Sequence, residues 1–267
     1  MRIINFPYVN SRPYFATMNR NDFRKLFKSV GPVVLPVIHV QDNAQAERNV
    51  RVAIGEGAAG VFLINHDFAY PQFLPIIRHI RNRFPALWLG VNFLAVTGRD
   101  AFPVLGQLAH EGVAVDGYWA DDARIDETSD RAHQSEAAEM LSIKLSCGWD
   151  GFYTGGTCFK KQREVDPRHY ATSAELATHF MDAVCTSGMA TGHAADLGKI
   201  KTFRKAIGNH ALMLASGITP ENAASYGTDV DGFMVATGIN KDKDFYNIDA
   251  SRLARLLKYT RETGART

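Results

Sequence analysis

Residues 211–238 read ALMLASGITPENAASYGTDVDGFMVATG, and this stretch decides the fold. Its two apolar runs, residues 212–215 and 232–236, have the length of buried β-strands and lack the polar alternation of half-exposed ones. Between them, Thr219-Pro220-Glu221 is typical of a helix start with an N-cap, a first-turn proline and an acidic residue. We therefore predict a helix over residues 221–226 and a strand–helix–strand unit with parallel strands.

The same unit recurs along the chain. Further apolar runs predict strands at residues 33–38, 60–64, 87–95, 113–119, 151–153 and 183–185. Helical periodicity marks residues 44–55, 72–83, 101–111, 131–146, 173–180, 197–207 and 251–262, and Ser173 is a candidate cap for its helix. Eight strand–helix units in 267 residues predict an α/β fold, a closed (β/α)₈ TIM barrel.

The sequence shows no internal domain boundary. Because no low-complexity linker or change in composition divides it, we expect residues 1–267 to form a single domain. Residues 1–32 would be an N-terminal extension and residues 33–262 the barrel. Within the extension, residues 22–29 (DFRKLFKS) predict a short helix that closes the bottom of the barrel.

The composition favours a protein that binds small molecules. Hydrophobic residues make up 46% and charged residues 22% of the chain, enough for a full core. A net charge of +2, without a basic run, argues against a nucleic-acid or membrane partner. Three cysteines without a C-x-x-C pair, and an N-terminus without the apolar core of a signal peptide, predict reduced thiols and a cytoplasmic location. Assembly into a homo-oligomer stays open.

Three late strands end in the same way. A hydroxyl residue and a glycine follow each apolar run, as Ser187-Gly188, Ser216-Gly217 and Thr237-Gly238. Glycine lets the backbone approach a ligand, and hydroxyl and amide groups donate hydrogen bonds to phosphate oxygens. Phosphate sites in this fold form from the loops after the seventh and eighth strands. Together these six residues are therefore predicted to bind phosphate, although each pair taken alone is more typical of a turn than of a ligand site.

Other polar residues stand where strands end, and these are the candidate catalytic residues. His39 and Asp121 could transfer protons, while Asn65 and Asn92 could orient hydroxyl groups. Lys160, after the fifth strand, could stabilise negative charge or form a Schiff base. For each of them, a loop cap, a satisfied polar group or a solvated lysine is the competing interpretation.

Metal and thiol chemistry have little support in the sequence. No H-E-x-x-H motif or compact cluster of histidine, cysteine and aspartate occurs, so no protein-held metal site is predicted. No cofactor is firmly implied, and Mg²⁺ held through carboxylates and a substrate phosphate stays open. Cys158 and Cys185 are expected to pack in the core rather than act as nucleophiles, and Asp116 is expected to be structural.

The last third of the sequence resembles the BtpA/SgcQ family. The segment 181–192, MDAVCTSGMATG, is similar to its ADAV-x-x-TG-x-x-TG pattern, and Ala215 to Asn222, ASGITPEN, resembles its SG-x-TPEN segment. Weaker resemblance extends over residues 33–257. The chain departs from the family at Val40-Gln41-Asp42-Asn43, where a proline-rich loop is usual, and at the paired Lys160-Lys161. These departures suggest a divergent substrate.

The resemblance implies a TIM barrel of the ribulose-phosphate-binding type with a phosphorylated small molecule as its ligand. Two functions follow as hypotheses. The first is an enzyme that acts on a sugar phosphate or nucleotide-type substrate, as a phosphoribosyltransferase, isomerase or lyase. The second is a non-catalytic assembly or regulatory factor that keeps the barrel, since a fold alone does not define a function.

Overall fold

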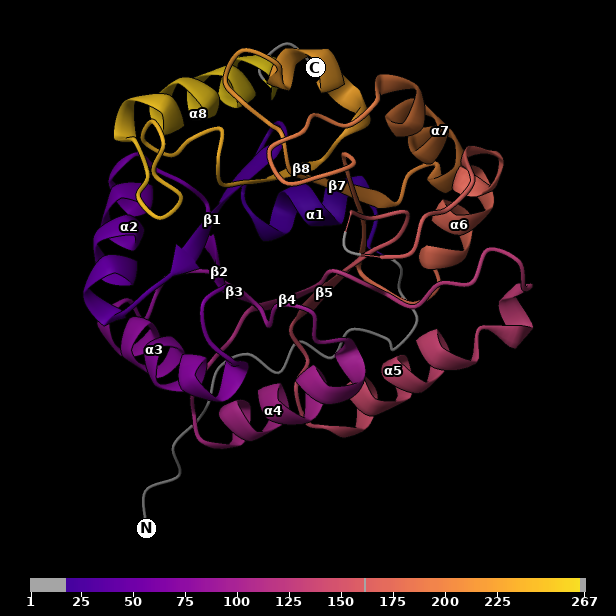
Figure 1. Cartoon of the computed structure of the whole chain (residues 1–267), viewed down its shortest axis with the longest axis horizontal. Helices are drawn as coiled ribbons and strands as arrows, with labels where there is room; N and C mark the ends of the chain where they lie inside the picture. The colour runs from indigo at the N-terminus through magenta and orange to yellow at the C-terminus, as the bar shows by residue number, and fades with distance from the viewer. Residues whose placement is uncertain (1–17, 161, 265–267) are drawn as a thin grey trace.

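The computed structural model describes residues 18–160 and 162–264, and their strands close into a barrel with strand order β1 to β8 (Figure 1). The strands are β1 (Val33–Val40), β2 (Val61–Asn65), β3 (Leu89–Asn92), β4 (Gly117–Ala120), β5 (Phe152–Gly156), β6 (Ala183–Ser187), β7 (Ala211–Ala215) and β8 (Gly232–Val235). The α-helices are α1 (Arg20–Leu26), α2 (Asn43–Gly55), α3 (Tyr70–Arg83), α4 (Gly98–His110), α5 (Ser135–Ser146), α6 (Tyr170–Ala177), α7 (Leu197–Ile207) and α8 (Ala250–Gly264). Short 3₁₀-helices lie at η1 (Arg131–His133), η2 (Pro167–His169) and η3 (Ala223–Asp229). The predicted (β/α)₈ barrel is confirmed.

All neighbouring strands are parallel, and β1 closes the barrel by pairing with both β2 and β8. Along β1, Val34 and Ile38 pack outwards in the layer beneath the helices, whereas Leu35 and Val37 point into the barrel. Both faces are therefore buried, which is why the strands read as unbroken apolar runs in the sequence. The same alternation turns His39, two residues after Val37, towards the barrel interior.

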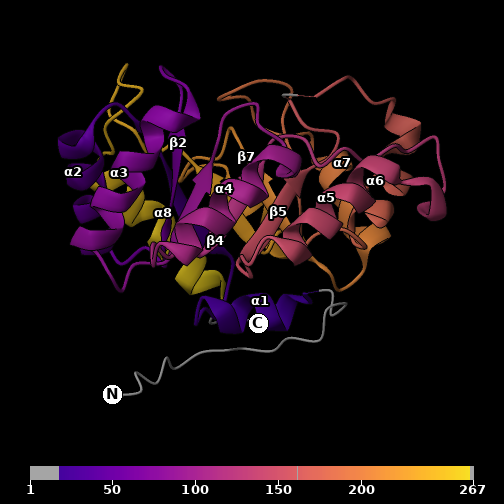
Figure 2. The same cartoon turned by 90° about the horizontal axis from the view of Figure 1, so that it is seen from below.

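Helix α1 covers the amino-terminal end of the barrel, opposite the strand ends that carry the candidate site (Figure 2). Phe23 is fully buried, and its ring lies 5.9 Å from that of Phe152 at the start of β5. The helix predicted to close the barrel bottom is thus confirmed, although it begins at Arg20 and ends at Leu26. Residues 1–17 of the expected extension lie outside the described residues.

Aspartates just before three even-numbered strands tie adjacent strands together. Asp116, Asp182 and Asp231 each accept a hydrogen bond from a backbone N–H of the preceding strand, at 2.8, 2.7 and 3.0 Å. Each also donates its own N–H back to a carbonyl oxygen of that strand. The structural role expected for Asp116 is confirmed, and it also pairs with Arg81 at 2.5 Å.

Three predicted helices differ from the structure. Residues 131–146 form the 3₁₀-helix η1 and then α5 rather than one helix. The segment after β7 is a 3₁₀-helix, η3, rather than an α-helix over residues 221–226, and it is kinked at Gly227, which has a φ of 43°. Helix α6 begins at Tyr170, so the prediction of Ser173 as its cap was wrong. The Ser173 hydroxyl is instead buried and lies 2.5 Å from that of Thr157, which links α6 to the end of β5.

Within the described part of the chain, no helix has the length and apolar character needed to span a membrane.

Candidate functional site

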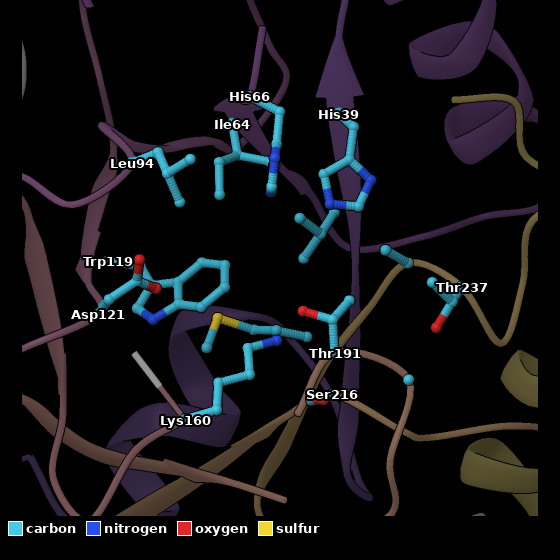
Figure 3. Close-up of a pocket in the computed structure, with 14 residues that line it drawn as sticks. His39, Ile64, His66, Leu94, Trp119, Asp121, Lys160, Thr191, Ser216 and Thr237 are labelled. Carbon is cyan, nitrogen blue, oxygen red and sulfur yellow. The ribbon is translucent and has the colours of Figure 1, made fainter. Parts of the chain in front are cut away.

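A cavity opens among the carboxyl ends of the strands, where this fold places its active sites (Figure 3). Its empty volume is about 470 Å³, including the part open to solvent. Residues from every strand or from the loop that follows it line the cavity: Val37, His39, Ile64, His66, Leu94, Trp119, Asp121, Lys160, Thr191, Gly192, Ser216, Met234, Ala236 and Thr237. Five predicted site residues are thereby brought together, namely His39, Asp121, Lys160, Ser216 and Thr237.

His39 follows the alternation of β1 into the cavity. Burial lowers the pKa of its imidazole to about 4, an effect that nearby His66 and Lys160 reinforce, so the ring is neutral at neutral pH. Its Nδ1 lies 3.0 Å from the carbonyl oxygen of Phe245, in the loop after β8. The ring stacks on that of Phe245 with centroids 3.8 Å apart, while His66 meets it edge-on at 5.1 Å.

Asp121 and Lys160 bring opposite charges into the same cavity. Asp121, just beyond β4, is buried, and its Oδ1 accepts a 3.3 Å hydrogen bond from Nδ2 of Asn92. Lys160 extends into the cavity from the side opposite His39 (Figure 3). A carboxylate, an ammonium and a neutral imidazole around one space can polarise a ligand and transfer its protons.

Hydrogen bonds to the end of β6 hold the loop that carries Lys160. The hydroxyl of Ser187 accepts a hydrogen bond from the backbone N–H of Lys160 at 2.9 Å. Lys199, near the start of α7, donates from Nζ to the carbonyl oxygens of Cys158 and Ser187, at 2.5 and 2.9 Å. Burial lowers the pKa of Lys199. Lys199 therefore joins the strand end of β6 to the Lys160 loop.

The three predicted phosphate-site glycines hold the loops after β6, β7 and β8 against one another. A Cβ on Gly188 or Gly217 would collide with the carbonyl oxygen of His193, in the loop after β6. A Cβ on Gly238 would collide with the carbonyl oxygen of Ile218, in the loop after β7. Gly217 also has a φ of 67°, which disfavours other residues. The loops after β7 and β8 therefore converge at Gly217 and Gly238.

At this convergence the backbone offers hydrogen-bond donors. Within residues 18–160 and 162–264, the amides of Gly217, Thr237 and Gly238 donate to no protein acceptor. The Ser216 hydroxyl donates to the carbonyl oxygen of Ala190 at 2.8 Å, and the Ser216 backbone has a φ of 76°. Such left-handed conformations at non-glycine residues cost energy and are frequent at functional sites. Free amides beside hydroxyl groups suit an anion.

Six predicted site residues are not in the cavity lining, namely Asn65, Asn92, Ser187, Gly188, Gly217 and Gly238. Asn65 uses both ends of its amide to hold loops, donating to Phe68 O at 2.7 Å and accepting from Leu94 N at 3.1 Å. Asn92 is fully buried, and it contacts the cavity lining by its hydrogen bond to Asp121. The Ser187 hydroxyl is buried and bonded to Lys160 N and Gly188 O.

The lining also contains residues that were not predicted as site residues, among them Trp119, Thr191 and Gly192. The signal for Thr191-Gly192 was available, because this pair repeats the Thr-Gly pattern of Thr237-Gly238. It was missed because the pair lies four residues after β6 rather than at the strand end. Gly192 faces Thr237, since a Cβ on Gly192 would lie 3.6 Å from the Thr237 hydroxyl.

Cys158 and Cys185 lie in the core. Both are buried, and burial raises the pKa of both thiols, as expected for packing residues. In the described ranges, no three histidine, cysteine, aspartate or glutamate side chains are grouped to hold a metal ion.

Comparison with known proteins gives a family match for part of the chain and solved structures of the same fold. Residues 164–262 match the BtpA family. The resemblance stated from the sequence is confirmed over this segment, which contains the ends of β6, β7 and β8 and therefore the candidate phosphate site. The weaker resemblance upstream lies outside the match to the BtpA family. No curated protein is significantly similar in sequence.

Solved structures of the same fold include three whose sequences are distant from this chain. The tryptophan synthase alpha chain of Legionella pneumophila has a TM-score of 0.60 and 19% identity, covering 93% of this chain and 98% of that one. (S)-3-O-geranylgeranylglyceryl phosphate synthase from Thermoplasma acidophilum, in complex with sn-glycerol-1-phosphate, has a TM-score of 0.60 and 14% identity over 92% and 100%. Phosphoribosylanthranilate isomerase from Thermotoga maritima has a TM-score of 0.57 and 12% identity over 86% and 99%. At these identities the similarity shows the TIM-barrel fold.

Proposed function

We propose that this protein is an enzyme whose barrel binds a phosphate ester and acts on a sugar-phosphate or nucleotide-type substrate. One observation carries the proposal: among the described residues the amides of Gly217, Thr237 and Gly238 donate to no protein acceptor, and Ser216 and Thr237, next to these glycines, line the same cavity as Lys160 and Asp121. Bound sn-glycerol-1-phosphate in a protein of the same fold supports it by analogy.

The proposed roles follow from the positions of the residues. The amides of Gly217, Thr237 and Gly238 and the Thr237 hydroxyl hold the phosphate, and binding there positions the rest of the substrate. Gly188 keeps the β6 loop in place, and Ser216 anchors that loop through Ala190. Thr191 and Gly192 approach the phosphate from this loop.

The reacting end of the substrate lies between His39, Asp121 and Lys160. His39 is neutral at neutral pH and accepts a proton, Lys160 stabilises negative charge on a substrate oxygen, and Asp121 orients or exchanges protons. Asn92 positions Asp121, whereas Asn65 shapes the loops. This arrangement suits an isomerase, a lyase or a phosphoribosyltransferase.

A thermal-shift series tests the proposal, because a ligand that binds only the folded chain raises its melting temperature. The probes are inorganic phosphate, glycerol phosphate, ribose 5-phosphate, phosphoribosyl pyrophosphate and nucleotides, each with and without Mg²⁺. We expect a sugar phosphate to stabilise the wild type, and Thr237→Val to weaken its binding about tenfold. Thr202→Val is the control, because the Thr202 hydroxyl bonds to Gly198 O within α7. Absence of binding by every phosphate compound would refute the proposal.

The competing function is a non-catalytic assembly or regulatory factor. The variant Lys160→Met distinguishes the two functions. If the protein is an enzyme, this substitution abolishes turnover of a bound sugar phosphate. For a factor without catalytic activity, the wild type would bind the ligand and leave it unchanged. Convergence of His39, Asp121 and Lys160 on one cavity favours the enzyme.

A further inference from the structure

The loop between β8 and α8 folds back over the ends of β1 and β2. Its two sides meet in an antiparallel bridge between Asn240 and Ile248. Helix α2 holds its tip, because the carbonyl oxygen of Tyr246 accepts hydrogen bonds from Gln45 and Asn49 at 2.7 and 2.8 Å. The Tyr246 hydroxyl donates to Asp67 at 2.9 Å, beyond β2. The loop is therefore fixed at several points rather than being free to swing.

Phe245, at the centre of this loop, contacts His39 in two ways. Its ring lies parallel to the imidazole, with centroids 3.8 Å apart and an interplanar angle of 11°. Its carbonyl oxygen lies 3.0 Å from His39 Nδ1 and also accepts a 2.8 Å hydrogen bond from Nδ2 of Asn240. Asn240 is itself buried, so this carbonyl oxygen is held in place.

The position of a proton follows from this contact. A carbonyl oxygen can only accept a hydrogen bond, so Nδ1 must be the donor and must carry a hydrogen. Because burial lowers the pKa of His39 to about 4, the neutral ring carries no second hydrogen at neutral pH. Nε2 therefore bears a lone pair, and Figure 3 shows the far end of the ring extending into the cavity. The ionisable groups facing His39 are His66, Lys160 and Asp67.

We propose that the β8–α8 loop fixes His39 as the Nδ1–H tautomer, so that Nε2 can act on the ligand only as a proton acceptor. Phe245 and Asn240 are then positioning residues for His39. This inference deepens the proposed function by naming the ligand chemistry, a phosphate ester with a hydroxyl or an acidic C–H group opposite Nε2. On transfer, Nε2 bonds to the proton, the ligand keeps the electron pair, and the imidazolium retains its hydrogen bond to Phe245 O.

Nitrogen NMR of the full chain tests the tautomer without any ligand. In ¹⁵N-labelled protein at pH 7.5, long-range ¹H–¹⁵N correlations distinguish a protonated from an unprotonated ring nitrogen, and His39→Gln identifies the signals. We expect a protonated Nδ1 and an unprotonated Nε2. A protonated Nε2 in the wild type would overturn the proposal, whatever the phosphate titrations show.

Two variants test whether the loop sets this state. Phe245→Ala removes the stacked ring, and Asn240→Leu removes the amide that holds the carbonyl oxygen. In both, we expect His39 signals averaged between the two tautomers. In Phe245→Ala, which uncovers the imidazole, we also expect the His39 pKa to rise towards 6.5, because burial is what lowers it. Asn247→Ala is the matched control, because Asn247 lies in the same loop and bonds to Asp244. If both folded variants keep the wild-type signals, the loop does not fix His39. If one variant fails to fold, the other decides.

Discussion

Gly217 lies where the loop after β7 packs against the loop after β6. It combines a φ of 67° with close packing against backbone atoms of His193 and Ala194. Side chains cannot give way there, because the neighbouring atoms belong to the backbone. A glycine is therefore required by packing as well as by conformation.

Gly217→Ala is expected to lower the free energy of unfolding by about 3 kcal/mol, from overpacking and left-handed strain together. Gly112→Ala is the control, because Gly112 has a similar φ of 78° and nothing within 4 Å of the added Cβ. Its loss should be about 1 kcal/mol. Urea denaturation measures both, and equal losses would show that the loop contact is loose.

Asp231 joins two helices to the barrel through buried ion pairs. Its carboxylate has no exposed surface and pairs with Arg20 of α1 and Arg204 of α7, each at 2.6 Å. Asp231→Asn leaves two partly buried guanidinium groups without their counter-charge, so we expect a loss of about 3 kcal/mol or more in unfolding free energy. Asp242→Asn breaks an exposed pair with Arg252 and should cost less than about 1 kcal/mol. A small effect at Asp231 would mean that solvent reaches this pair.

At the scale of elements, α1 and the site loops occupy opposite ends of the barrel. The short helix has little stability of its own and depends on burial of Phe23. The cavity lies at the carboxyl ends of the strands, at the opposite end of the barrel from α1. Stability and ligand binding should therefore respond separately to changes in α1.

Phe23→Ala is expected to reduce the free energy of unfolding by about 3–5 kcal/mol, through lost burial and a cavity beneath β5 and β8. At a low temperature, where the Phe23→Ala variant is still folded, it should keep the phosphate affinity of the wild type. Lys25→Ala, with an 80% exposed side chain in the same helix, should change neither quantity. Denaturation and phosphate titration of the same samples check the expectation, and loss of affinity in Phe23→Ala would show coupling between the two ends.

For the whole molecule, two buried histidines make stability depend on pH. A histidine in the unfolded chain titrates near pH 6.5, whereas burial lowers the pKa of His39 and His210 to about 4 in the folded chain. Between these values the unfolded chain binds protons that the folded chain does not, so stability falls as the pH falls. The contribution is complete above about pH 6.5.

Urea denaturation should show a loss of about 2 kcal/mol for each of these histidines between pH 7 and pH 5. His210→Gln should remove about half of this pH dependence, since His39 keeps its share. A wild-type stability that does not change between pH 7 and pH 5 would contradict the lowered pKa values.

The sequence by itself determined the barrel and much of its site. Apolar runs and helical periodicity are local properties, so the strands could be predicted from residues such as those of 212–215 without knowledge of contacts. His39, Asp121, Lys160, Ser216 and Thr237 were predicted as site residues from their positions after strands, and they line one cavity because parallel strand ends meet at one rim.

Tertiary structure alone decided what each polar atom does. Phe245 stands 206 residues from His39 in the chain, yet its carbonyl oxygen contacts the imidazole. Asn65 and Ser187 accept hydrogen bonds from backbone N–H groups of neighbouring loops, while Thr191 lines the cavity from within a loop. Hydrogen-bond partners and burial depend on folding back of distant segments, which no local pattern of residues records.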